Sequence, residues 1–106
     1  MAASRRKYNN RTLTKTSHKK PLQTVEGHLC FYLVDGRVLQ NLRQLSDALT
    51  NIHEDVFKHH VNSERNDFSN WAKDVFQEKS LSNQLKLCKT PVSCQRVLGK
   101  YLKNTF

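Results

Sequence analysis

The chain has 106 residues, of which 37% are hydrophobic and 25% are charged, and its formal net charge is +9. This length provides one small domain that buries only a modest fraction of its surface on folding. Because no apolar run approaches the roughly 20 residues that cross a bilayer, and no apolar block follows the basic start, we expect neither a membrane anchor nor a secretory signal.

Residues 1–25 form the first predicted element, a basic arm that contains no Asp or Glu and carries a charge of +7. Its aliphatic residues are too sparse to offset the entropy of ordering, so we predict that it is disordered when free. The arm either keeps the protein soluble or lies along a polyanion such as RNA or DNA. Its composition overlaps with that of an organellar transit peptide, but the apolar face of such a peptide is missing. The cations proposed to bind nucleic acid are Arg5, Arg6, Lys7, Arg11, Lys15, Lys19 and Lys20.

Residues 29–39 are apolar or β-favouring around an Asp35-Gly36 dipeptide, which suits a type I′ turn. This pattern predicts a short hairpin. The alternative is an extended apolar segment with a turn; in either case it must pack on helices, because an isolated hairpin is marginally stable. Phe31, Tyr32 and Arg37 could form a stacking platform for single-stranded nucleic acid, or the rings could simply cover a thin core.

Two short helices are predicted next. The first runs from about residue 42 to 51, with Asn41 as its N-cap and Gln44 reaching back as in a capping box. An apolar stripe recurs along it at helical spacing. The second runs from Glu54 to Val61, with acidic residues in its first turn and histidines in its last, which complements the helix dipole.

The pattern over residues 66–76 predicts a helix around which the core is organised. Asn66 is a suitable N-cap, and the only Trp of the chain follows it. Apolar residues at positions i, i+3, i+7 and i+8 share one helical face. We therefore predict a core that contains Phe57, His60, Phe68, Trp71, Val75 and Phe76.

Two further helices complete the prediction. Ser80 is expected to cap the first of them, and Thr90-Pro91 marks the start of the second. Gly99 lies inside the last helix, where it weakens the helix or allows a close helix contact. Arg96, Lys100 and Lys103 form a basic stripe opposite the apolar face of this helix. The stripe is either an ordinary solvated face or an extension of the polyanion-binding surface.

The sequence contains no persuasive catalytic or metal-binding pattern. His59 and His60 with Cys88 and Cys94 could be zinc ligands, but five residues separate the two cysteines and there is no Cys-x-x-Cys pair. Cysteines on apolar helix faces behave as small hydrophobes rather than nucleophiles. With no Gly-rich phosphate loop either, we expect no metal, no cofactor and no enzymatic activity. The odd number of cysteines favours reduced thiols and a cytoplasmic location.

A longer pattern covers roughly the last two-thirds of the chain. It comprises Phe31, Asp35-Gly36-Arg37, Leu42-x-x-Leu45, Phe57-x-x-His60-Val61, Asn66-Asp67-Phe68-x-x-Trp71-x-x-x-Val75-Phe76 and Leu81. This pattern resembles a family of small, mostly helical archaeal and bacterial domains of unknown function. The chain departs from it after the Trp helix and in its basic arm. The resemblance implies a fold and domain limits but supplies no catalytic residues. It also suggests that His60, Asn66 and Asp67 fix the loop between the helices, with His60 packed near the Trp71 helix and bonded to this loop.

Together these observations predict a mainly α protein. A disordered basic arm, residues 1–25, precedes a small helical domain, residues 26–106, built as a compact bundle of about five short helices with a small N-terminal β-hairpin or extended segment. The predicted function is non-enzymatic binding of RNA, DNA or a ribonucleoprotein such as the ribosome, through the arm and the C-terminal helix. The alternative is a protein-interaction or regulatory module whose acidic middle face or hairpin edge docks a partner.

Overall fold

A computed structural model describes residues 21–105, so the cations predicted at positions 5 to 20 lie outside the described residues. The described chain is mainly helical, with five α-helices and a two-stranded antiparallel sheet, which confirms the predicted fold class. No helix in this part of the chain has both the length and the apolar character needed to cross a membrane. In chain order the elements are η2 (Gly27–Leu29), β1 (Phe31–Tyr32), β2 (Val38–Leu39), α1 (Leu42–Leu49), α2 (Glu54–His60), α3 (Asp67–Asp74), α4 (Lys79–Leu85) and α5 (Pro91–Thr105).

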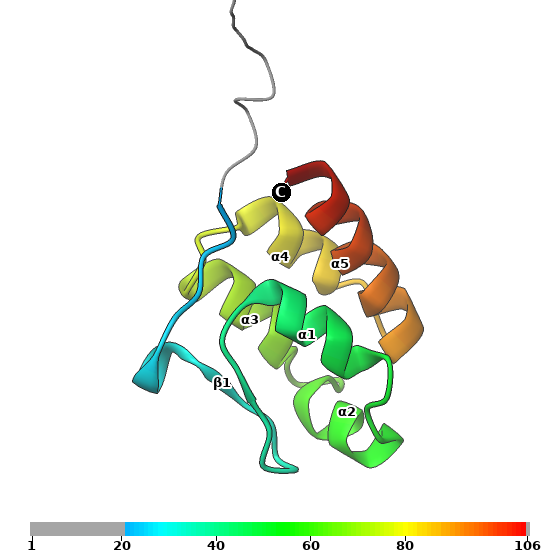
Figure 1. Ribbon diagram of the computed structural model, residues 1–106. Helices are drawn as coiled ribbons and strands as arrows, with labels where there is room; N and C mark the ends of the chain where they lie inside the picture. The colour runs from blue at the N-terminus through cyan, green and yellow to red at the C-terminus, as the bar shows by residue number, and fades with distance from the viewer. Residues whose placement is uncertain (1–20, 106) are drawn as a thin grey trace, which may run out of the picture.

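The helices enclose one core (Figure 1). Helix α1 packs against α5, α3 packs against α4, and α4 also contacts α5. The hairpin lies beside α1 and α3, with β2 in contact with α1. The residues with no exposed surface are Leu45, Phe68, Ser69, Ala72, Leu85, Cys94 and Leu98, so the centre of the core is shared by α1, α3, α4 and α5.

Side-chain caps begin three of the five helices where the sequence predicts them. The Asn41 side chain accepts a hydrogen bond from the Gln44 N–H, and Asn66 accepts one from the Ser69 N–H. Thr90 Oγ1 accepts from the Ser93 N–H at the start of α5. The predicted capping box differs in one respect, because Gln44 Oε1 accepts from the Gln40 N–H rather than from the capping residue.

The predicted cap of α4 was wrong. Ser80 lies inside the first turn, and the N-cap position is held by Glu78, which makes no side-chain capping bond. The preceding turn explains the shift, because Gln77 has φ 55 and the Glu78 N–H donates to the Ala72 carbonyl. This turn, rather than a serine, reverses the chain and positions the start of α4.

The central helix is shorter than predicted, because α3 ends at Asp74 and Val75 is its C-cap. Phe76 therefore does not continue the helical face. It is nevertheless buried, because the turn at Gln77 directs it back onto Trp71, with ring centroids 4.9 Å apart. Val75 is half-buried at the edge of the core.

The hairpin forms in the register Phe31 opposite Leu39, but its turn is not the predicted type I′ turn. A type I′ turn would place Asp35 and Gly36 at the two central positions, both with positive φ. Instead the Leu33 carbonyl accepts from the Gly36 N–H, and Gly36 (φ 100) follows the central residues. The Asp35 carboxylate accepts from the Arg37 N–H at 3.0 Å, which stabilises this longer loop.

Residues 22–25, which the sequence placed in the arm, pack against the domain. Val25 is buried and its N–H donates to the Gln40 carbonyl at 2.9 Å, while Leu22 lies against the core. The Asn41 side chain donates to Thr24 Oγ1 at 3.2 Å. Among the described residues, Leu22 and Val25 are the first apolar side chains along the chain that pack against the core.

Replacing Gly99 with alanine should stabilise the protein. Gly99 is exposed within α5, and a Cβ added there meets no atom within 4 Å, so no close helix contact requires glycine. We expect the free energy of unfolding to rise by about 0.5–1 kcal/mol, because alanine loses less backbone entropy in a helix. Thermal melting measures this change. Gly36→Ala is the control and should destabilise, because φ is +100 there; a lower melting temperature for Gly99→Ala would contradict the prediction.

Candidate nucleic-acid interface

The charges of the folded domain are segregated along the chain. All nine carboxylates of the sequence lie between residues 26 and 78, whereas the part from residue 79 onward has six cations and no acid. These six residues belong to α4, to α5 and to the loop between them, and the two helices pack side by side (Figure 1). None of the six forms an ion pair with another described residue. They are Lys79, Lys86, Lys89, Arg96, Lys100 and Lys103.

The predicted basic stripe lies on the solvent-facing side of α5. Arg96, Lys100 and Lys103 are all exposed. Cys94, Leu98 and Leu102 face the core instead. Three cations on one exposed helical face can contact successive anionic groups without displacing any part of the core. The structure therefore brings these three predicted residues together.

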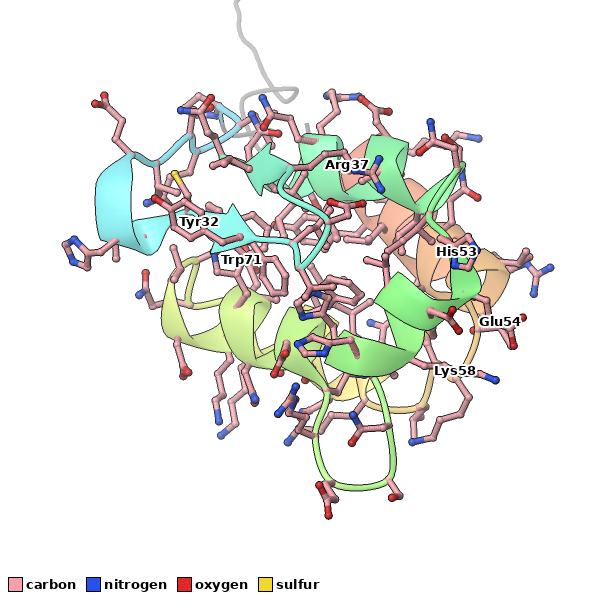
Figure 2. The ribbon with its side chains drawn as sticks, turned by 90° about the horizontal axis from the view of Figure 1, so that it is seen from below. Tyr32, Arg37, His53, Glu54, Lys58 and Trp71 are labelled. Carbon is pink, nitrogen blue, oxygen red and sulfur yellow. The ribbon has the colours of Figure 1, made fainter. Side chains whose placement is uncertain are left out.

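The predicted stacking platform does not assemble on the hairpin. Phe31 is buried, where it contacts His60, Phe68 and Trp71, so its face is not available to a base. Tyr32 remains exposed, and Figure 2 shows it and Arg37 on the hairpin. The Arg37 guanidinium is held by Asp35 at 3.0 Å and by Asn51 at 2.9 Å.

A polar network surrounds His60, which the sequence predicted as a core residue that contacts the loop before α3. His60 Nε2 accepts a hydrogen bond from the Val34 N–H at 3.1 Å, so Nε2 carries no hydrogen. In the neutral imidazole the hydrogen is therefore on Nδ1, which donates to Asp67 Oδ2 at 3.0 Å. Arg65 Nε lies 3.4 Å from the same carboxylate oxygen. Both ring nitrogens thus have protein partners, which suits a structural histidine rather than a catalytic base.

Sequence reasoning missed two members of this network. The Val34 N–H belongs to the hairpin loop, 26 residues from His60, and backbone donors leave no mark in a sequence pattern. Arg65 lies two residues before Asp67, which could have suggested it as a member. Its charge alone does not show that its guanidinium pairs with the Asp67 carboxylate. The network joins the hairpin, α2 and the start of α3.

The candidate zinc ligands His59, His60, Cys88 and Cys94 do not assemble into a metal site. In residues 21–105 no three His, Cys, Asp or Glu side chains are grouped so that they could hold a metal ion. All three cysteines are buried and unpaired. Burial, together with the nearby Cys88 thiol, raises the pKa of the Cys94 thiol to about 12. A thiol with this pKa stays protonated at neutral pH and is therefore a poor nucleophile.

Cys94 should make stability depend on alkaline pH. An exposed thiol has a pKa near 9.0, so above that pH the unfolded chain loses the proton that folded Cys94 retains up to about pH 12. The contribution of Cys94 to the free energy of unfolding is therefore complete below pH 9. As the pH rises further, the free energy of unfolding falls by up to about 1.4 kcal/mol per pH unit. Denaturant unfolding between about pH 8 and pH 10 measures this fall. The decline should be shallower in Cys94→Ala; equal slopes would contradict the prediction.

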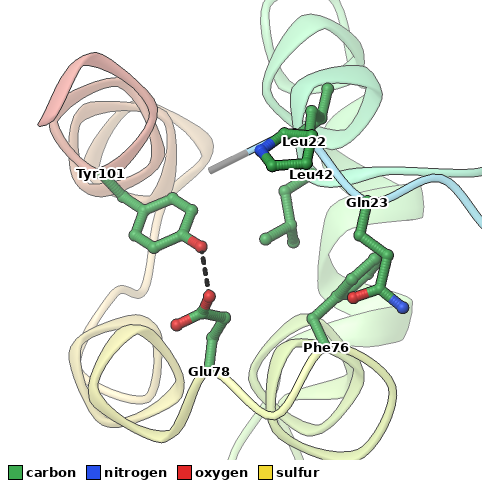
Figure 3. A pocket seen from close by; sticks show the side chains of 7 residues that line it. Leu22, Gln23, Leu42, Phe76, Glu78 and Tyr101 are labelled. Carbon is green, nitrogen blue, oxygen red and sulfur yellow. Dashed lines mark hydrogen bonds between the residues drawn. The ribbon is translucent and has the colours of Figure 1, made fainter. Parts of the chain in front are cut away.

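A small pocket lies where the start of the described chain meets α1, α5 and the turn before α4 (Figure 3). Its volume of about 50 Å³ suits ordered water rather than a substrate. The Tyr101 hydroxyl donates to Glu78 Oε2 at 2.6 Å across it. Burial raises the pKa of Tyr101, and the hydrogen bond to this carboxylate raises it further. The pair thus ties α5 to the start of α4.

No protein-family model matches the chain, and no curated protein or solved structure is significantly similar to it. The resemblance to small helical domains of unknown function therefore stays a prediction.

Proposed function

We propose that this protein is a non-enzymatic nucleic-acid-binding protein that contacts RNA, DNA or a ribonucleoprotein. Binding uses the cations of residues 1–25 together with the exposed face of α5. The observation that carries the proposal is the acid-free pair of helices α4 and α5, whose cations have no carboxylate partner among the described residues. Such a surface attracts phosphates and releases their counterions, without strong preference for sequence.

The segregation of charge also orients the protein on a polyanion. Seven of the nine carboxylates lie on the hairpin side, α1, α2 and α3, so that part of the domain is repelled, while Glu64 lies in the loop after α2 and Glu78 at the N-cap of α4. The α5 stripe is left to face the nucleic acid, and the cations of the N-terminal segment add further phosphate contacts.

The test is a titration of full-length protein against fluorescent RNA and duplex DNA at several salt concentrations. We expect affinity to fall steeply with salt. For the variant Arg96→Gln/Lys100→Gln/Lys103→Gln, the slope of log K against log salt concentration should be smaller in magnitude by about 2–3. Each phosphate contact contributes about 0.7–0.9 to this slope. A second variant, in which the seven arm cations are replaced by Gln, measures how much of the salt slope arises from the arm.

The matched control is Arg43→Gln/Lys58→Gln/Lys73→Gln, which removes the same charge from α1, α2 and α3. It should alter the salt slope much less than the α5 variant does. Equal effects of the two triple variants would mean that net charge rather than the α5 face governs binding. Absence of binding by the full-length protein at moderate salt would overturn the proposal.

A protein-interaction module is the second candidate function. It is favoured by the apolar pair Tyr32 and Val38, which are directly opposite one another in the sheet and are 56% and 47% exposed. Val34 in the hairpin loop adds further exposed apolar surface. Docking on this face would change little with salt, because apolar contacts are not screened. Substituting Tyr32→Ser and Val38→Ser should then abolish partner binding while leaving nucleic-acid binding intact.

A further inference from the structure

A polar hollow lies between the loop that joins α2 to α3 and the loop that joins α4 to α5. Its volume is about 320 Å³, at the lower end of the range of small-molecule sites. Arg65, Lys86 and Lys89 contribute three cations to its lining, and Glu64 contributes its only carboxylate. The remaining lining is serine and asparagine, so every side chain around the hollow is polar.

The walls of the hollow are held in place by hydrogen bonds within the protein. Asn66 caps α3 and also donates through Nδ2 to the Leu85 carbonyl at 2.8 Å, which joins the start of α3 to the end of α4. The Asn62 N–H donates to the Arg65 carbonyl at 2.9 Å and closes the intervening loop. The Arg65 guanidinium donates to the His59 carbonyl at 2.8 Å. A site with fixed walls loses little conformational entropy when a ligand binds.

Two of the three cations of the hollow are not neutralised by a described carboxylate, and the third, Arg65, is paired with Asp67. Lys86 and Lys89 form no ion pair with another described residue. Arg65 Nε lies 3.4 Å from Asp67, which does not line the hollow. Lys86 and Lys89 are therefore the ammonium groups left to bind an anion. A phosphomonoester carries about −1.5 to −2 at neutral pH and presents three acceptor oxygens, so it can bond to both groups at once and is attracted more strongly than a phosphodiester with its single charge.

We propose that this hollow binds the terminal phosphate of a nucleic-acid strand. The inference rests on the proposed function, because it makes the end of the bound strand a specific contact beside the general contacts of the arm and α5. Ammonium and guanidinium groups form charge-assisted hydrogen bonds with phosphate oxygens, and the asparagine amides can donate to the same oxygens.

The test uses full-length protein and one single-stranded RNA prepared with a 5′-phosphate, with a 3′-phosphate or with hydroxyls at both ends. We expect one phosphorylated form to bind about tenfold more tightly than the hydroxyl form, as one or two charge-assisted hydrogen bonds provide. The variant Lys86→Gln/Lys89→Gln should abolish this preference. The control Arg43→Gln/Lys73→Gln removes the same charge outside the hollow and should retain it.

The outcomes separate this inference from the proposed function. If RNA binds with a steep salt dependence but neither terminal phosphate improves affinity, the terminal-phosphate site is wrong while the function stands. If both double variants lose the preference equally, general charge explains it and the site is again wrong. If neither the RNA nor the duplex DNA of the salt titration binds, the proposed function fails. An NMR titration with inorganic phosphate then decides the site: saturable shifts at Asn70, Lys86 and Lys89, absent in the double variant, support it, and unchanged spectra overturn it.

Discussion

Replacing Trp71 with alanine is expected to lower the free energy of unfolding by about 3–5 kcal/mol. In a domain this small, that loss is enough to leave most molecules unfolded. The indole ring is buried between α3 and the segment that leads into β1 (Figure 2). It contacts the rings of Phe31 and Phe76, with centroids 5.5 Å and 4.9 Å away. Its Nε1–H donates to the Leu29 carbonyl at 2.8 Å. Alanine would therefore leave a cavity and an unpaired carbonyl where α3 meets the hairpin segment.

Circular dichroism and denaturant unfolding measure this loss. Trp71→Phe is the matched variant, because phenylalanine keeps a ring in the cavity but cannot donate to Leu29. We expect it to lose about 1–3 kcal/mol, between the parent and Trp71→Ala. If Trp71→Ala melts like the parent, the central place of this residue in the core is wrong.

Replacing His60 with alanine should be the second large loss, about 2–4 kcal/mol. The substitution removes a buried ring that packs against Phe31 and Phe68. It also leaves two partners without their hydrogen bonds, the Val34 N–H and the Asp67 carboxylate. The hairpin loop and the start of α3 would lose their common contact. An unsatisfied buried polar group costs more free energy than its hydrogen bond contributes. The fall in the free energy of unfolding should therefore exceed that expected from removing the packed ring alone.

His59→Ala is the control for this substitution, because His59 is exposed and adjacent to His60. Its effect should stay within about 0.5 kcal/mol. Nitrogen NMR of the histidine rings tests the network independently of stability. At a pH where the imidazole is neutral, His60 should carry its hydrogen on Nδ1. An Nε2–H tautomer would mean that the hydrogen bond from Val34 is absent in solution.

Helix positions could be predicted from the sequence because their signals are local. An N-cap such as Asn41, Asn66 or Thr90 bonds to an N–H only three residues further on, so the cap and its partner lie in one short window. Apolar periodicity likewise depends on the next few residues. The separation of acidic from basic regions also follows from the sequence, because consecutive helices keep neighbouring residues together.

Ends and turns were harder to predict, because several local conformations compete there. Helical spacing continues through Val75 and Phe76, yet the chain leaves the helix after Asp74 and reverses at Gln77. The reversal allows Phe76 to fill the space beside Trp71. At the hairpin, Asp35-Gly36 suited a two-residue turn, but bonding of the Asp35 carboxylate to Arg37 favours the longer loop.

By itself, the sequence determined that this protein is a small, mainly helical domain with an acidic middle, a basic C-terminal pair of helices and a basic N-terminal region. Only the tertiary structure decided which distant groups meet. Trp71 bonds to a carbonyl 42 residues away, and the polar hollow combines Arg65 with Lys86 and Lys89 from another loop. Such contacts depend on how the helices pack around one core. Packing is the sum of many weak interactions, so no single residue pattern in the sequence encodes it.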